Sequence, residues 1–260
     1  MPKCIVCCKW TLDERDIKIN LKDLSLDTSR AKGKISDFDR NAIEEGALIV
    51  ERHGGTVHAL TYGTPAVRQS LKDVLSRGPE AVFWIADKSA ETADACVTAN
   101  VLAAAIRKLG PYDLILCGEG SSDLFNQQTG ERLGALLGLP CVSYVEKLTV
   151  EGDTVKVTRK LADCTEVATV KFPVVLSVLH QINKPRIPSL KQVLAAGKKP
   201  NKELKIRDLD LKPHELQPKS VHKWVRGFVA KRKNIVYKES SAAANVAKLA
   251  NSLAAEGLCR

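Results

Sequence analysis

The sequence predicts an α/β fold: a mostly parallel β-sheet with helices on both faces, then an antiparallel hairpin extension and a C-terminal arm. Short apolar runs alternate with helical periods over the first two-thirds of the 260 residues, an order typical of parallel sheets covered by helices. Residues 118–130 form a glycine- and hydroxyl-rich stretch between an apolar run and a helical one. A hydrophobic fraction of 44% permits a full core.

Strands and helices are expected in alternation along this first part. The predicted strands are residues 4–9, 56–61, 81–85 and 114–117. The predicted helices are residues 37–51, 65–75, 92–109 and 128–137. The first helix is indicated by apolar residues at helical spacing, Ala42, Ile43, Ala47 and Leu48. Pro65 suits the first turn of the second helix, and Gly138 ends the last one.

The pattern changes after residue 140. Further strands are expected at 144–148, 155–161, 166–170 and 174–179. The first three form an antiparallel hairpin, residues 144–170, and the fourth returns to the main sheet. After residue 197 the chain is polar, prolyl and basic, which favours an arm laid on another polypeptide, with a final helix at 240–256. We therefore expect an α/β domain at 1–197 and an arm at 198–260.

Charge and cysteines narrow the class of protein. The net charge of +10 is concentrated in the last third without interleaved aromatic residues, which favours an acidic protein partner over nucleic acid. No apolar run is long enough to cross a bilayer. The apolar run at the N-terminus is too short for a signal peptide, so we expect a cytoplasmic protein. Cys4 and Cys7 would point to opposite faces of one strand, which excludes a shared metal. All eight cysteines, including Cys259, are expected to be reduced, buried thiols.

Common catalytic motifs are absent from the sequence. There is no G-x-S-x-G elbow, no G-x-G-x-x-G after the first strand and no Walker A loop, and the five histidines are scattered. We therefore expect a nucleotide-binding or carrier subunit without catalytic residues or a metal.

Three loops are expected to converge at the carboxyl edge of the sheet, where α/β folds bind ligands. They follow the first strand, precede the helix at 37–51, and span residues 118–130. The free N–H groups of the helix after this last loop can hold a phosphate, whereas Asp123 would repel one and suits a ribose or a base amine. Asp37 or Ser36 fits equally well as the N-cap of the helix at 37–51, and Thr129 could instead cap its own helix. The predicted binding residues are Cys8, Lys9, Ser36, Asp37, Phe38, Gly63, Gly118, Asp123, Asn126, Gln127, Gln128 and Thr129.

Residues 183–195, which we name the docking loop, carry a second candidate site. Two prolines, Pro185 and Pro188, hold the backbone extended before a short helix that begins at Ser189. Leu190 follows, with charges around it at Lys184, Arg186 and Lys191. An apolar anchor with a charged rim is typical of a docking surface. The alternative is that these residues only connect neighbouring helices and strands, with Leu190 buried in the core.

Three motifs together indicate a family. They read Ser36-x-Phe38-Asp39-x-x-Ala42-Ile-Glu44, Gly118-x4-Asp123-x4-Gln128-Thr-Gly130 and Asn183-x-Pro185-Arg-x-x-Ser189-Leu190. With them the chain resembles the β (small) subunit of electron-transfer flavoproteins over nearly its whole length. The run Asp73-Val-Leu-Ser-Arg-Gly78 is similar to the branch encoded with carnitine and nitrogen-fixation genes.

The resemblance implies an adenine-nucleotide α-hydrolase-like (Rossmann-like) fold and a heterodimer with an FAD-carrying α subunit, which the C-terminal region clasps. It implies AMP or a second FAD in this chain, and a partner acyl-CoA dehydrogenase or reductase that the docking loop recognises through Leu190. Nucleotide contacts carry over to Cys8, Ser36, Phe38, Asp123, Gln128 and Thr129.

The sequence departs from the family pattern at two places that bear on which nucleotide this chain binds. Electron-bifurcating members commonly read Asp-Gly-Asp-Thr-x-Gln-Val-Gly-Pro, where this chain has Asp123-Leu-Phe-Asn-Gln-Gln-Thr-Gly-Glu131. Where those members have Asn-Pro-Phe before the first helix, this chain has Ser36-Asp37-Phe38. These departures favour AMP slightly, and leave a bifurcating FAD as the near alternative. A stand-alone adenine-nucleotide sensor, similar to universal stress proteins, is the alternative from another class.

Overall fold

The computed structural model describes residues 1–258, and the chain divides into two compact units. The first unit comprises residues 1–18 and 26–225. The second comprises residues 19–25 together with those from 226 onward. Each unit is described by itself below, and none of the described helices is long and apolar enough to span a bilayer.

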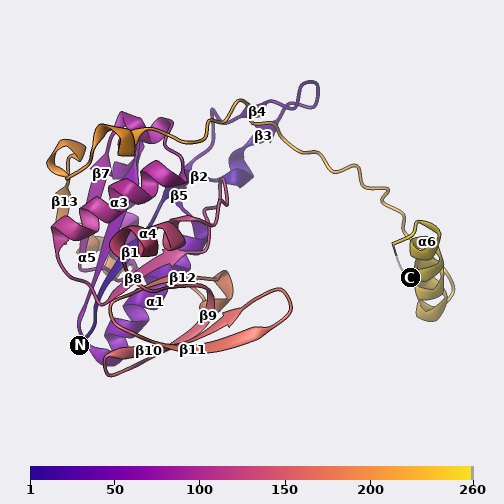
Figure 1. The fold of residues 1–260 in the computed structure, drawn as a ribbon. Helices are drawn as coiled ribbons and strands as arrows, with labels where there is room; N and C mark the ends of the chain where they lie inside the picture. The colour runs from indigo at the N-terminus through magenta and orange to yellow at the C-terminus, as the bar shows by residue number, and fades with distance from the viewer. Residues whose placement is uncertain (259–260) are drawn as a thin grey trace. The chain divides into compact units, whose positions relative to one another are not determined.

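A nine-stranded sheet forms the centre of the first unit, in the order β11-β10-β9-β12-β8-β1-β6-β7-β13 (Figure 1). Its strands are β1 (Lys3–Cys7), β6 (Thr56–Gly63), β7 (Ala81–Ala86), β8 (Leu114–Gly118), β9 (Cys141–Glu151), β10 (Thr154–Lys160), β11 (Thr165–Lys171), β12 (Val174–Val178) and β13 (Asn201–Glu203). The pairs from β9 through β12, β8, β1, β6 and β7 to β13 are parallel, and β9, β10 and β11 are antiparallel. The mostly parallel sheet and its antiparallel hairpin extension are thus confirmed.

Helices cover both faces of this sheet. The α-helices of the first unit are α1 (Asp37–His53), α2 (Leu71–Ser76), α3 (Ala95–Leu109), α4 (Thr129–Leu137) and α5 (Leu190–Ala196). Successive residues of β1 alternate between two cores because side chains on a strand alternate between faces. Cys4 and Val6 lie in the core that α1 and α2 cover, and Ile5 and Cys7 in the core that α3 and α4 cover. The predicted opposite orientation of Cys4 and Cys7 is confirmed.

Several elements differ from the prediction at their ends. The helix expected at 92–109 begins at Ala95, since the carboxylate of Asp94 accepts a hydrogen bond from the Val97 N–H at 2.9 Å and caps it. The helix expected at 65–75 is a 3-10 turn, Pro65–Ser70, followed by α2. Short strands not predicted are β2 (Trp10–Leu12), β3 (Lys18–Ile19), β4 (Leu26–Asp27) and β5 (Gly33–Ile35). Short 3-10 turns lie at Glu14–Asp16, Lys88–Glu91, His180–Ile182, Ile206–Asp208 and Pro213–Leu216.

The change of composition at Lys198 does not coincide with the division between the units. Strand β13 extends the sheet beside β7, and Leu204 and Leu209 are buried in the core on the α3 face. Residues 198–225 therefore belong to the first unit. The second unit contains α6 (Ala242–Ala255), where a helix was predicted at 240–256, and Ser241 caps it through the Ala244 N–H at 3.2 Å. Cys259 lies outside the described residues.

Candidate functional site

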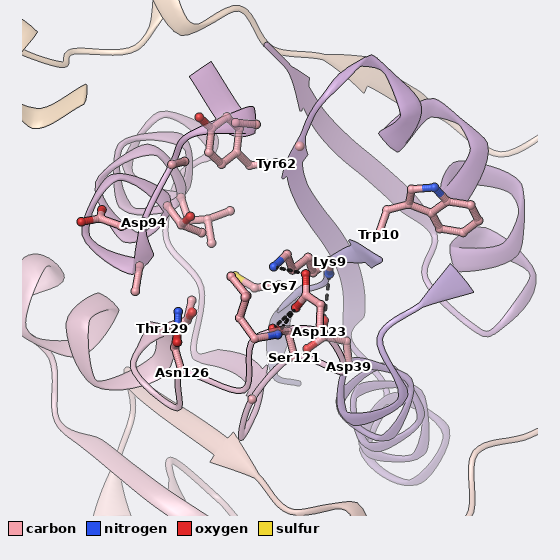
Figure 2. A pocket seen from close by; sticks show the side chains of 18 of the residues that line it. Cys7, Lys9, Trp10, Asp39, Tyr62, Asp94, Ser121, Asp123, Asn126 and Thr129 are labelled. Atoms are coloured by element: carbon pink, nitrogen blue, oxygen red, sulfur yellow. Dashed lines mark hydrogen bonds and ion pairs between the residues drawn. The ribbon is translucent and has the colours of Figure 1, made fainter. Parts of the chain in front are cut away.

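A pocket of about 560 Å³ opens at the carboxyl ends of β1, β6 and β8 (Figure 2). Its walls are the residues that follow these three strands, the N-terminal turn of α3, and the segment 218–222. The volume lies within the range of pockets that hold small ligands and cofactors. The strand ends of an open parallel sheet are also where such ligands bind. The pocket therefore lies at the edge of the sheet that the sequence indicated.

Asp39, in the first turn of α1, joins two walls of the pocket. Its side chain is buried, and its carboxylate accepts hydrogen bonds from the Lys9 N–H at 2.8 Å and the Gly118 N–H at 3.3 Å. These amides follow β1 and end β8, so one side chain fixes the ends of two adjacent strands. Burial raises the pKa of Asp39 to about 7. The motif beginning at Ser36 contains Asp39, but the predicted site did not include it.

Asp123 and Lys9 form an ion pair in the wall of the pocket, with Nζ and Oδ2 2.6 Å apart (Figure 2). Asp123 also accepts hydrogen bonds from the Leu124 N–H at 2.8 Å and from the hydroxyl of Ser121. Burial raises the pKa of Asp123, but the Lys9 ammonium and these hydrogen bonds hold it below its usual value. An ionised carboxylate accepts hydrogen bonds from hydroxyl and amine groups and repels phosphate.

The N-terminus of α4 has no side-chain cap. Its N-cap residue is Gln128, whose side chain instead accepts a hydrogen bond from Arg132 Nε at 3.0 Å. The alternative in which the Thr129 hydroxyl caps this helix is not observed. Thr129 lines the pocket, and the first N–H groups of a helix have no partner within the helix.

The loop between β8 and α4 depends on glycine and on aromatic packing. A Cβ atom on Gly118 would lie 2.6 Å from Asp39 Oδ1 and 2.8 Å from the carbonyl carbon of Phe38. Phe38 packs on Phe125 of this loop, with ring centroids 5.1 Å apart. Phe125 and Gln127 both have positive φ, at 47° and 53°. The backbone at the end of β8 can therefore approach α1 only because residue 118 has no side chain.

Eight of the predicted binding residues line the pocket: Cys8, Lys9, Gly63, Gly118, Asp123, Asn126, Gln127 and Thr129. Four do not: Ser36, Asp37, Phe38 and Gln128. Ser36 is fully buried and its hydroxyl accepts a hydrogen bond from the Ser122 N–H at 3.2 Å. Asp37 pairs with Lys34 at 2.7 Å. In this structure these four residues shape the loops around the pocket and do not face its interior.

The segment 218–222, which we name the strap, borders the pocket and was not predicted. Pro218, Val221 and His222 line the pocket. Oδ2 of Asp94 accepts hydrogen bonds from the N–H groups of Lys219 at 2.6 Å and Ser220 at 3.0 Å. Asp94 thus caps α3 and holds the strap at the same time. No local pattern in residues 218–222 indicated this position.

The docking loop presents apolar side chains to solvent. Ser189 and Gln192 form a capping box at the start of α5. Leu190 is 75% exposed and Ile187 is 93% exposed, so the alternative that places Leu190 in the core is excluded in this structure. Lys184 and Lys191 are exposed beside them.

Arg186 was expected in the charged rim of the docking loop, and the structure corrects this. Its guanidinium points back to α1, with Nε 2.8 Å from Glu44 and Nη1 2.5 Å from Glu51. The two lysines therefore remain as rim charges, while Arg186 is bound to the body of the unit.

Comparison with known families identifies one family for this chain. A family model described as the electron transfer flavoprotein domain matches residues 23–209. The match includes α1, the loop between β8 and α4, and the docking loop, which carry the three sequence motifs. It covers more than half of the chain. The chain therefore belongs to the electron transfer flavoprotein family.

Proposed function

We propose that this chain is the β (small) subunit of an electron-transfer flavoprotein, of the branch encoded with carnitine and nitrogen-fixation genes. It pairs in the cytoplasm with an FAD-carrying α subunit, and the pair moves electrons between an acyl-CoA dehydrogenase or reductase and a second redox partner. The flavin of the α subunit supplies the redox chemistry. This chain holds a nucleotide and binds the dehydrogenase. The observation that carries the proposal is a pocket bordered by the uncapped α4 within a domain of this family.

AMP is the nucleotide that the pocket favours. Five carboxylates line it, those of Asp39, Glu91, Asp94, Glu119 and Asp123, whereas Lys9 is its one lysine. Carboxylates accept hydrogen bonds from ribose hydroxyls and repel phosphates. A single phosphate could bind at the N-terminus of α4, where the first N–H groups of the helix have no side-chain cap. A triphosphate, which a stand-alone sensor would bind, fits this lining poorly.

The nucleotide content of the purified heterodimer tests this proposal directly. Denaturation releases the bound nucleotides, and chromatography identifies them. One FAD and one AMP per heterodimer is the expected result. Two FAD molecules per heterodimer would support the bifurcating alternative. An isolated chain that is monodisperse and binds ATP without a partner would contradict the carrier function.

Replacement of Asp123 by alanine tests the pocket. The variant loses the ribose acceptor and leaves Lys9 without its ion-pair partner, so the AMP content of the heterodimer should fall. The matched control is Asp163→Ala, because Asp163 is an exposed carboxylate between β10 and β11. Unchanged AMP content in Asp123→Ala would assign this carboxylate to the loop structure alone.

Replacement of Leu190 by alanine tests the docking loop. Because Leu190 is 75% exposed, its truncation should leave the fold intact while removing apolar contact with the dehydrogenase. We expect slower reduction by the dehydrogenase at unchanged flavin content. Val167→Ala, a change at a 61% exposed residue of β11, is the control. Equal rates in both variants would remove Leu190 from the interface.

The second unit is proposed to clasp the α subunit. Its exposed apolar side chains include Phe228 at 86%, Val236 at 73% and Leu249 at 47%. Lysines and arginines also outnumber acidic residues from 226 onward. A chain ended after Val225 should keep the first unit folded but lose the α subunit during co-purification.

A further inference from the structure

Polar contacts between the docking loop and α1 are concentrated at two residues of the loop. The first is Asn183. Asn41 of α1 donates hydrogen bonds to the carbonyl of Asn183 at 2.8 Å and to its side-chain oxygen at 3.0 Å. In return, Nδ2 of Asn183 donates to the carbonyl of Asn41 at 3.0 Å and to Glu45 at 2.9 Å. This reciprocal set fixes the start of the loop on the middle of α1.

The second residue is Arg186, which contacts α1 through four donor groups. Its Nε and Nη2 donate to the two carboxylate oxygens of Glu44 at 2.8 and 2.9 Å, and its backbone N–H donates to Glu44 at 3.0 Å. Nη1 reaches Glu51 at 2.5 Å. Glu44 is only 7% exposed as a side chain. Such bidentate, partly buried pairs are among the strongest hydrogen-bonded contacts in proteins.

The opposite side of the same segment is apolar and open to solvent. Ile187, directly after Arg186, is 93% exposed, and Leu190 and Leu194 are 75% and 63% exposed. Nothing in the apolar character of these residues favours this orientation, because burial would stabilise them. The polar contacts with α1 hold the other side of the loop inward, together with the hydrogen bond from Arg77 Nη1 to the carbonyl of Arg186 at 3.1 Å and the burial of Ala196. Pro185 and Pro188 also restrict the backbone conformation of the loop.

We propose that Arg186 is a positioning residue, which holds the docking loop on α1 through Glu44 and Glu51 so that Ile187 and Leu190 stand together as the anchor for the dehydrogenase. The inference rests on the proposed function, since it assigns the docking loop a partner. Lysine cannot reproduce these contacts, because an ammonium group lacks the planar fork that donates to both oxygens of Glu44 while it also reaches Glu51. The role thus depends on geometry as well as on charge.

The test compares Arg186→Lys with Arg159→Lys in the purified heterodimer. Arg159 lies on the hairpin and pairs with Glu166 at 3.6 Å, so it is a control for the same chemical change. Amide hydrogen exchange of residues 183–195 is the first measurement. We expect it to rise at least about tenfold in Arg186→Lys, since loss of a charge-assisted bidentate contact is of that order. Unchanged exchange in this peptide would overturn the proposal.

Steady-state kinetics with a butyryl-CoA dehydrogenase as electron donor is the second measurement. A loosened loop should raise the KM for the heterodimer at unchanged flavin content and with little change in kcat. A structural defect away from the loop would instead lower the flavin content. Glu44→Gln should give the same loosening, and the double variant should add little to either single change.

Leu190→Ala separates this inference from the proposed function. A raised KM for Leu190→Ala together with an unchanged KM for Arg186→Lys would overturn the positioning role and leave the docking function intact. Faster exchange in Arg186→Lys, with an unchanged KM in both variants, would support the contact with α1 and contradict the docking function.

Discussion

Asp39→Asn tests whether a buried carboxylate determines how the stability of this protein depends on pH. Asp39 is 7% exposed and its pKa is raised by burial to about 7. Asparagine has nearly the same shape and does not ionise. The variant therefore removes the charge, while its side-chain oxygen can still accept one of the two backbone N–H groups, those of Lys9 and Gly118.

The sign of the pH dependence follows from the pKa of Asp39 in the folded and in the unfolded protein. The pKa of Asp39 is higher in the folded protein than its ordinary value of 3.8, so the folded state binds more protons than the unfolded state between these two pH values. Its ionisation therefore lowers the free energy of unfolding as the pH rises from about 4 to about 7. A shift of roughly three pH units corresponds to about 4 kcal/mol, of which about 3 kcal/mol develops between pH 5 and pH 8. The lost acceptor costs about 1–3 kcal/mol at any pH.

Urea denaturation of the nucleotide-free protein from pH 5 to pH 8 provides the measurement. Other titrating groups cancel in the difference between variant and wild type. We expect Asp39→Asn to be destabilised or neutral at pH 5 and to gain about 3 kcal/mol relative to wild type by pH 8. A difference that stays constant within about 1 kcal/mol over this range would refute the reasoning.

Three further predictions concern other contacts. Gly118→Ala should lower nucleotide content and destabilise the fold by about 1–3 kcal/mol, because its Cβ would displace Phe38; normal content and stability would contradict this. Lys199→Met should lower the free energy of unfolding by about 1–3 kcal/mol, since Nζ donates to the carbonyl of Leu75 at 2.9 Å; unchanged urea midpoints would argue against that contact. Among the described thiols, exposed Cys164 should react with iodoacetamide well before Cys8, whose pKa burial raises; peptide mass analysis that shows equal rates would contradict the burial of Cys8.

The sheet and its helices could be predicted because their signals are local. Apolar runs and helical spacings fix β1, β6, β7, β8 and α1 within a few residues. Strand β13 could not be predicted, since Asn-Lys-Glu has no apolar period and becomes a strand only by pairing with β7.

The candidate site was predictable where loops follow strands, and not where distant contacts determine orientation. Lys9 and Asp123 line the pocket because they follow β1 and β8. Arg186 was placed in the charged rim because it lies near Leu190 in the sequence, as Lys184 and Lys191 do. Its partner Glu44 is 142 residues away along the chain, and no local pattern reveals such a pair. The strap depends in the same way on Asp94, 125 residues from Lys219.

Helix α1 contributes to both candidate sites, and its length between them is therefore constrained. Asp39 lies at the pocket and Glu44 at the docking loop, little more than one turn apart. Each added or deleted residue between them would rotate the second half of the helix by about 100°. After such a rotation, Asp39 could not face the pocket while Glu44 still faces the docking loop. Insertions and deletions should thus be tolerated in the turn between β10 and β11 and rejected between Asp39 and Glu44.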